Sequence, residues 1–549
     1  MGRSAVLALA AIVLIAGSLS LIRPGYSVDE EFTVFAVRGI QSHGLPLLPS
    51  GLLYDRGIAY SYASWLAGAV TGLELPAFRA VSVASAALAV LLIFLLVRRV
   101  AGEAAAVTAA LLAAVSVPFW ATATSARFYG PFLGAYLLAL YLLTHRHWWL
   151  GLIAAAALAR LTHELAFTLA AIPLIGLLLA KGDRRHWLLM TFAVTSGLVI
   201  GQSVLFAFHY AAPSSGATMV QRFFLWQVLN LFERPGDCQF MIPIVVLIVG
   251  VLVAPRRAWI VTVSSLSVAV LIASMSIAQA SNSAPLSWPM VQTVLVDGSR
   301  YPLDMFWHVL RLTPLTVLTA LVLIVYRSRG EWPPRHRAAH LMWVGWVLWF
   351  GVIDSGITTN YLLLPITFLL VAIAIDGMSV MPRVAFAILA AAIAVDQWRA
   401  TTLEAARPTV AADGIEEVRS GLQSNDRVVC TDELGCLMLV GRIDRWLALD
   451  DFVRERFVVR RGDGPLTGVY TGVPAVFRPA DLFNPDSDGT LPDRVVIVDV
   501  FKDFPIGNSR SWLPKALDED GLRVVPLLET AQLRVLQVTP PEQQARLQP

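Results

Sequence analysis

The strongest constraint on this chain is a long succession of apolar segments, each about as long as a bilayer is thick. The first covers residues 5–22, and similar segments recur up to residue 398. Only 15% of the residues are charged, whereas soluble domains carry roughly 25%. Because a helix needs about 20 apolar residues to cross the hydrocarbon core, we expect a multi-pass α-helical membrane protein with about 13 transmembrane helices.

Clusters of basic residues between these segments predict the orientation. Lys and Arg close to the ends of a span favour the cytoplasmic side of the membrane. The expected location is a bacterial cytoplasmic membrane. Arg3 therefore places the N-terminus in the cytoplasm, and an odd number of spans places the C-terminal region outside the cytoplasm. A cleaved signal peptide is the alternative for residues 5–22. The other clusters lie at 98–99, 145–147, 181–186, 256–257 and 327–340.

The composition changes near residue 400, where charged residues and prolines return. We therefore expect a transmembrane catalytic module over 1–400 and a small extracytoplasmic α/β domain over 401–549, with buried strands at 427–430 and 494–500. Cys430 and Cys436 could form a short-loop disulfide or remain two buried thiols. No Cys/His spacing typical of structural zinc occurs, and no long basic run suggests nucleic-acid binding.

The most unusual polar feature is Asp29-Glu30-Glu31, which opens a predicted external loop over residues 23–57. Charges beside the hydrocarbon are poorly solvated and costly. The cluster is either a solvated loop start without a role or a catalytic centre. In the second interpretation a carboxylate deprotonates an incoming hydroxyl group. We predict Asp29 as this base, Glu30 as its support and Glu31 as solvated loop.

The second half of the same loop supplies another acid and a cation. Tyr54, Asp55 and Arg56 stand just before an aromatic segment over 58–75, whose composition predicts a helix lying in the membrane interface. Arg56 either snorkels to lipid headgroups or binds a phosphate, with Asp55 orienting it or binding the acceptor.

Further polar motifs fall in loops on the same predicted face. Arg127 and Tyr129 predict either a site for a lipid phosphate or an interfacial aromatic belt. A second pair, His163 with Glu164, could cap helix ends or bind a sugar or a divalent metal. Two further pairs could line a donor groove. These two are Arg300 with Tyr301 and Asn360 with Tyr361.

The order of these motifs resembles the membrane glycosyltransferases of the C-type (GT-C) fold over roughly residues 1–380. The similarity is to bacterial relatives of protein O-mannosyltransferase and of the lipid A aminoarabinose transferase. Its motifs are Asp29-Glu30, then Tyr-Asp-Arg-Gly from Tyr54, Ala-Arg-Phe-Tyr-Gly from Ala126, and Leu-Thr-His-Glu from Leu161.

The resemblance implies inverting transfer of a sugar from a polyprenyl-phosphate donor on the outer face of the membrane. It implies Asp29 as the base, with Asp55 and Arg56 binding acceptor or phosphate. The chain departs from the family at Gly57-Ile58, where Pro-Pro is common, and at Asn360, where a basic residue is common. Arg300 or Arg127 could then replace the missing cation.

The predicted function is therefore a glycosyltransferase that acts on a lipid, an envelope glycan or a protein. The competing function is a transporter or flippase of a lipid-linked sugar, which would place ionisable residues inside the spans. The sequence specifies neither the sugar and acceptor nor the need for a metal.

Overall fold

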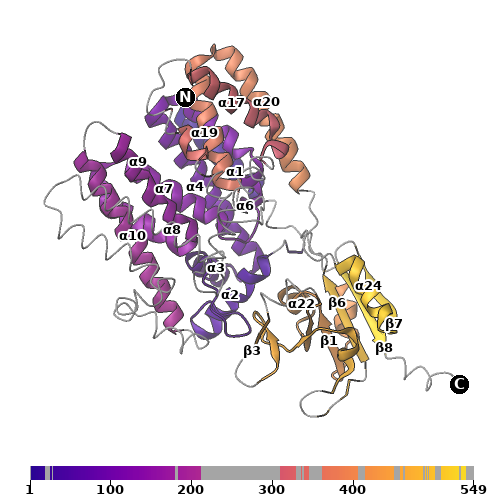
Figure 1. The fold of residues 1–549 in the computed structure, drawn as a ribbon. Helices are drawn as coiled ribbons and strands as arrows, with labels where there is room; N and C mark the ends of the chain where they lie inside the picture. The colour runs from indigo at the N-terminus through magenta and orange to yellow at the C-terminus, as the bar shows by residue number, and fades with distance from the viewer. Residues whose placement is uncertain are drawn as a thin grey trace, which may run out of the picture. The chain divides into compact units, whose positions relative to one another are not determined.

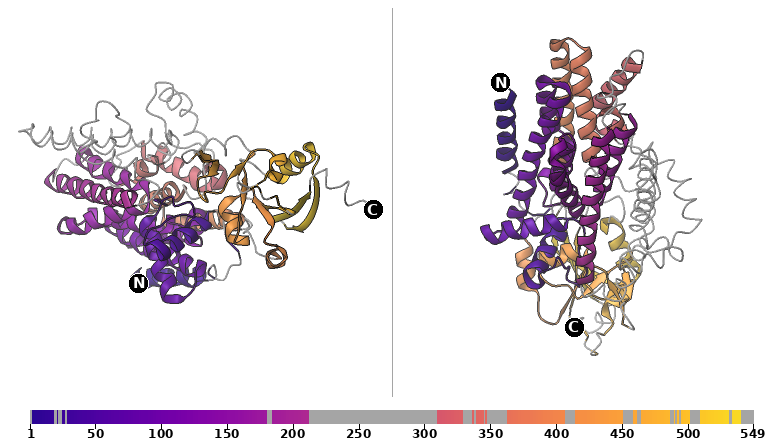
Figure 2. Two further views of the ribbon diagram at one scale, coloured as in Figure 1. Left: turned by 90° about the horizontal axis from the view of Figure 1, so that it is seen from below. Right: turned by 90° about the vertical axis from the view of Figure 1, so that its left-hand side faces the viewer.

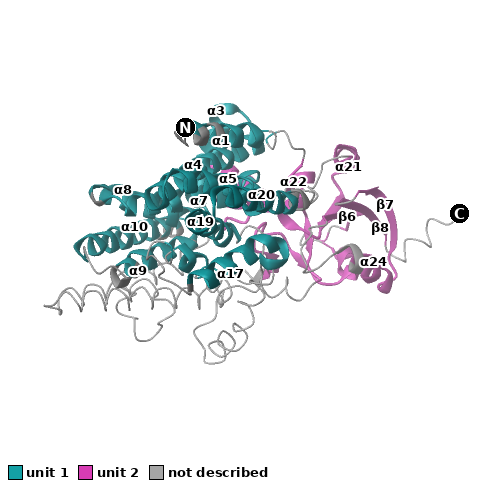
Figure 3. Ribbon diagram, turned by 90° about the horizontal axis from the view of Figure 1, so that it is seen from above, with its two compact units in different colours: residues 1–21, 55–211, 215–406 teal, residues 22–54, 212–214, 407–549 magenta. Residues whose placement is uncertain are grey.

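The computed structural model describes residues 2–18, 29–179, 184–211, 309–328, 362–405, 414–449, 464–485, 494–500, 509–530 and 533–539, with a few short pieces between them. The chain divides into two compact units (Figure 3). Unit 1 comprises residues 1–21, 55–211 and 215–406, and unit 2 comprises residues 22–54, 212–214 and 407–549. Residues 22–54 thus group with the C-terminal residues, whereas the sequence assigns them to the transmembrane module.

Unit 1 is built from helices. Its Ala- and Leu-rich runs favour helix because these side chains lose little rotamer freedom there. Within this bundle α8 packs against α7 and α10, and α4 packs against α5 and α7 (Figures 1 and 2). The described helices are α1 Gly2–Ser18, α3 Ile58–Thr71, α4 Leu75–Ala101, α5 Glu103–Ala114, α6 Val117–Ala123, α7 Tyr129–Leu143, α8 Trp149–Thr162, α9 Ala171–Leu179, α10 Arg184–Ala211, α17 Pro314–Ser328, α19 Leu363–Val380 and α20 Arg383–Ala405.

Four helices of the described part are long and apolar enough to cross a membrane, namely α4, α10, α19 and α20. Helices α5 and α6 would form a fifth span, bent by 61° at their junction. Among the recurring apolar segments for which the sequence predicts spans, those at 77–97, 187–209 and 383–398 lie within α4, α10 and α20. The sequence between α10 and α17 lies outside the described residues, so the count of about 13 remains a prediction.

The predicted interfacial segment is helical, since α3 covers residues 58–71. It begins after Gly57, whose φ is 73°, and ends at Gly72, whose φ is 71°. Both glycines adopt the left-handed conformation, which other residues reach only at a cost. The helix therefore ends before the predicted boundary at residue 75.

Unit 2 contains a six-stranded sheet in the order β5-β2-β1-β6-β8-β7. The first four strands in this order run parallel, and β8 and β7 add antiparallel pairs. Strands β1 and β6 lie where the sequence predicts strands, and their Val and Ile side chains form the core together with Leu513 and Leu517 of α24. The strands are β1 Asp426–Cys430, β2 Arg445–Leu447, β5 Ala475–Val476, β6 Arg494–Val500, β7 Arg523–Glu529 and β8 Leu533–Thr539; the helices include α22 Glu433–Val440 and α24 Ser509–Glu519.

The two cysteines at the edge of this core form a disulfide. Cys430 is the last residue of β1 and Cys436 lies in α22, with their Cα atoms 6.0 Å apart. The structure thus selects the first of the two alternatives for this pair. The bond ties the start of α22 to the end of the central strand.

The segment 22–54 is more ordered than a loop. Helix α2 covers Glu30–His43, and residues 46–54 form a small hairpin that returns beneath it, with Leu47 bridged to Leu53. Gly39 of α2 leaves room for the backbone of Leu47. The prediction of a solvated Glu31 is wrong, because Glu31 is fully buried, as is Glu30. A helical turn hides side chains that an extended loop would expose.

Candidate functional site

A buried cation in unit 1 forms the centre of the candidate site. Arg127 lies in the turn between α6 and α7 and is only 5% exposed. Its guanidinium carbon lies 4.8 Å from the ring centre of Phe128 and 5.9 Å from that of Tyr129. The Ser82 hydroxyl of α4 donates to the Arg127 carbonyl at 3.2 Å and fixes the turn. A desolvated guanidinium backed by aromatic rings is suited to binding an anion such as a phosphate.

His163 extends this cluster from the break between α8 and the 3-10 helix Glu164–Ala170. Its ring lies 5.1 Å from that of Phe128 and 5.0 Å from that of Phe132. Its Nδ1 accepts the Leu165 N–H at 3.0 Å, as a helix cap. The capping alternative is therefore confirmed for His163. A neutral ring with Nδ1 as acceptor carries its proton on Nε2, which then acts as a donor.

The loop before α3 comes to the same cluster. A methyl group added at Gly57 would lie 2.6 Å from the Cβ atom of Phe128, so these residues are in direct contact. Asp55 and Arg56 precede this glycine and are exposed. Tyr60 of α3 donates to the Phe78 carbonyl at 2.8 Å, which anchors the helix on α4. The structure thus gathers the predicted residues Arg127, Tyr129 and His163, and it brings Gly57, which directly follows Asp55 and Arg56, against the same cluster.

The predicted base belongs to unit 2. Asp29 is half-buried and stands at the N-cap of α2 with φ of 70°, the one positive φ outside glycine among the described residues. A left-handed aspartate is tolerated because its short polar side chain can bond locally. Such strained conformations concentrate at functional sites. Tyr54, the last residue of the hairpin, is buried and stacks on Phe32 with 5.6 Å between ring centres.

A charge cluster that the sequence interpretation missed lies at the end of α19. Asp376 is fully buried, and its carboxylate contacts His336 and accepts from His340 Nε2 at 2.8 Å. Arg327 Nε lies 3.4 Å away. Trp343 donates its indole N–H to His340 Nδ1 at 3.1 Å, so the proton of a neutral His340 resides on Nε2. The contacts form an ionic anchor between helix ends.

Arg79 was missed as well. It lies in the first turns of α4 and is 1% exposed, which makes it the largest fully buried side chain of the described residues. Its position in the sequence was the available signal, because the predicted topology places Arg79, like Arg127, at the outer end of a span, where cations are less common.

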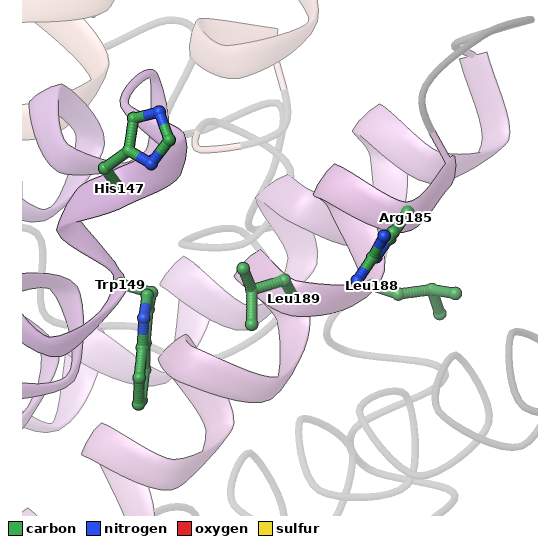
Figure 4. Close-up of a pocket in the computed structure, with 5 residues that line it drawn as sticks. All are labelled: His147, Trp149, Arg185, Leu188 and Leu189. Atoms are coloured by element: carbon green, nitrogen blue, oxygen red, sulfur yellow. The ribbon is translucent and has the colours of Figure 1, made fainter.

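A cavity of about 540 Å³ opens between the starts of α8 and α10 (Figure 4). His147 and Trp149 line one side, and Arg185, Leu188 and Leu189 of α10 complete it. Helix α8 begins at this cavity and ends beside His163, and at 1.5 Å per residue its length is roughly 20 Å. The cavity is therefore separate from the Arg127 cluster.

The remaining predicted site residues lie where the structure says nothing of their contacts. Glu164 begins the 3-10 helix after His163, but its side chain is not described. Arg300, Tyr301, Asn360 and Tyr361 lie outside the described residues. Within the described part, no three His, Cys, Asp or Glu side chains are arranged to hold a metal ion.

Comparison with known proteins gives one family match. Residues 55–209 match the family model described as dolichyl-phosphate-mannose-protein mannosyltransferase. This stretch contains the whole Arg127 cluster and excludes Asp29. A search of curated proteins returned no significant match. The family match confirms the predicted resemblance to the protein O-mannosyltransferase branch.

Solved structures show weaker similarity. ArnT from Cupriavidus metallidurans in the apo state aligns over 97% of both chains, with 14% identity and a TM-score of 0.45. The same protein bound to undecaprenyl phosphate gives 13% identity, 97% coverage of both chains and a TM-score of 0.45. The Archaeoglobus fulgidus oligosaccharyltransferase tethered with an acceptor peptide aligns over 90% of this chain and 69% of its own, with 13% identity and a TM-score of 0.46. Because these TM-scores are low, we draw no conclusion from the structural similarity and rely on the family match alone.

Proposed function

We propose that this protein transfers one sugar from a polyprenyl-phosphate carrier to an acceptor hydroxyl on the outer face of the cytoplasmic membrane, with inversion. The observation that carries the proposal is the buried Arg127 guanidinium among aromatic rings, inside the stretch that matches a mannosyltransferase family.

The chemistry is a direct displacement at the anomeric carbon. Asp29 accepts the proton of the acceptor hydroxyl as its oxygen attacks, and the bond from the anomeric carbon to the phosphate oxygen breaks. The polyprenyl phosphate leaves with an added negative charge. Arg127 stabilises this charge, and the Nε2–H of His163 can donate to a phosphate or sugar oxygen. Arg56 and Asp55 bind the phosphate and the acceptor.

The role assigned to each group predicts the size of the kinetic effect when that group is removed. Loss of a general base reduces the rate about 10²–10⁴-fold. Removal of a donor that stabilises developing charge costs about 10²–10³-fold in kcat. Asp29→Asn and Arg127→Ala should therefore both lower kcat strongly while the protein remains folded.

The test uses purified protein in lipid nanodiscs with a panel of radiolabelled polyprenyl-phosphate sugars. Transfer to added acceptors and release of polyprenyl phosphate are measured together. Asp518→Asn and Arg185→Ala are matched controls, because both side chains are exposed and Arg185 lies at the distant cavity. Full activity of Asp29→Asn would remove the assigned base.

The same experiment distinguishes transfer from the transport alternative. A flippase would move labelled lipid-linked sugar across a sealed vesicle without releasing polyprenyl phosphate. Asp376 and Arg79 are ionisable and buried in spans, but both lie near helix ends, and Asp376 is held by two histidines and an arginine. A substrate path would need ionisable groups near mid-span. Asp396 of α20 is such a group among the described residues, and it pairs with the exposed Arg399 at 3.4 Å.

A further inference from the structure

The C-terminal part of the chain contacts the segment that carries Asp29, within unit 2. Ser50, at the tip of the hairpin 46–54, donates its N–H to the Tyr470 carbonyl at 3.0 Å. Its hydroxyl donates to the Val469 carbonyl at 2.7 Å and accepts the Leu52 N–H at 3.3 Å. One serine thus joins the hairpin to the turn formed by residues 469–471 through two hydrogen bonds.

An aromatic contact joins the same turn to α2. Phe32, in the first turn of that helix, meets Tyr470 edge to face at 4.8 Å and stacks on Tyr54 at 5.6 Å. The Phe32 N–H also donates to the Asp29 carbonyl at 3.3 Å. Phe32 stands three positions after Asp29, so Tyr470 packs against the helical turn that carries Asp29 at its N-cap.

The turn itself is held by a buried acid. Glu433, the first residue of α22, accepts the N–H groups of Tyr470 and Thr471 at 3.2 and 3.3 Å. It is 3% exposed and lies against Gly468. The Cys430–Cys436 disulfide fixes the start of α22 to the sheet. A rigid path therefore runs from the sheet core through Glu433 to the turn.

We propose that the 469–471 turn is a positioning clamp that holds α2, and with it Asp29, in the geometry needed for proton transfer. The proposal rests on the function assigned to Asp29 above. Ser50, Tyr470 and Glu433 are positioning residues, since each acts through α2. The C-terminal part of the chain then serves catalysis by orienting the base.

Hydrogen exchange and kinetics of the full-length protein test this clamp. Tyr470→Ala and Ser50→Ala should speed amide exchange in residues 30–54 by about tenfold, because each removes a contact that closes the segment. With polyprenyl-phosphate sugar as substrate, kcat should fall about tenfold to a hundredfold while KM for the donor stays within about twofold.

Conservative and control variants separate positioning from a general loss of folding. Tyr470→Phe keeps the edge-to-face ring contact and should restore both exchange and kcat. Ser420→Ala removes a serine hydroxyl that also donates to a backbone carbonyl in unit 2, in the short helix α21 (Ile415–Gly421), and should change neither readout. If Tyr470→Ala folds poorly, Ser50→Ala compared with Ser420→Ala still tests the clamp.

Two results would overturn the clamp. Exchange in residues 30–54 could stay at the wild-type rate in Tyr470→Ala, or it could rise while kcat stays unchanged. Failure of the transferase proposal would appear differently, as wild-type protein without transfer from any donor. In that case the exchange comparison still tests whether the 469–471 turn holds α2, since faster exchange supports this restraint and unchanged exchange refutes it.

Discussion

Glu433 gives the sharpest prediction, because its environment makes folding depend on pH. Burial raises the pKa of its carboxyl group from 4.5 to about 8, against the opposing hydrogen bonds from Tyr470 and Thr471 and with support from the negative charge of Asp432. Folded protein at neutral pH therefore holds a proton on Glu433. The unfolded chain releases that proton above its ordinary pKa.

The sign of the effect follows from this proton. Below pH 4.5 both states are protonated, and the stabilising contribution is fully present. Between that pH and about 8 the folded state holds more protons, so the free energy of unfolding falls as pH rises, by up to about 1.4 kcal/mol per pH unit. Over the whole interval the upper limit is about 5 kcal/mol.

Glu433→Gln removes this dependence. The Gln amide oxygen can accept the same two N–H groups, and the side chain is close to isosteric with the neutral acid. We expect local opening of α22 and of residues 464–473, measured by hydrogen exchange of the full-length protein, to show a flatter pH dependence in the variant. The two proteins should be similar at pH 5, and the variant should be more stable at pH 8.

The control is Glu416→Gln, which changes a glutamate whose side chain is 75% exposed. This control should keep the wild-type slope. Equal slopes for wild type and Glu433→Gln, after correction for the intrinsic pH dependence of exchange, would refute the reasoning, because the proton would then reside elsewhere.

Two further predictions concern backbone and covalent restraints. Gly57→Ala should destabilise unit 1 by about 2–4 kcal/mol and lower transfer, because its φ of 73° and the nearby Phe128 ring both oppose a side chain. Gly44→Ala, with φ of 73° and no neighbour within 4 Å, should cost only about 1–2 kcal/mol; equal thermal shifts would contradict the packing argument. Cys430→Ser with Cys436→Ser opens a short loop and should lower the stability of unit 2 by about 2 kcal/mol in denaturant unfolding. An unchanged midpoint would contradict this estimate.

The sequence predicted the helical membrane module well because hydropathy is a local property. Apolar runs of span length became α4, α10 and α20, and α3 formed where aromatic residues suggested a helix. The same holds for strands β1 and β6, whose Val-rich runs read as buried strands. His163 meets Arg127 and Tyr129 in one cluster although it lies more than 30 positions further along the chain.

Features that depend on tertiary partners were not predictable in this way. Helix α2 was read as loop because its acids and glycine obscure any apolar stripe, and Glu31 was therefore placed in solvent. The ion cluster of Asp376 could not be predicted, because its histidine partners follow a different helix and are distant from it in sequence. Glu433 was likewise invisible, since its altered ionisation arises from burial that only the folded chain creates.

The grouping of residues 22–54 with residues 407–549 has a consequence for biosynthesis. More than 350 residues separate the two pieces along the chain. At a translation rate of about 5–20 residues per second, the early segment waits roughly 20–70 s for its partner. During that interval α2 and its buried acids are without their packing surface. Maturation of unit 2 is therefore a late, non-local step, which truncation near the C-terminus would prevent even though every apolar span had already been made.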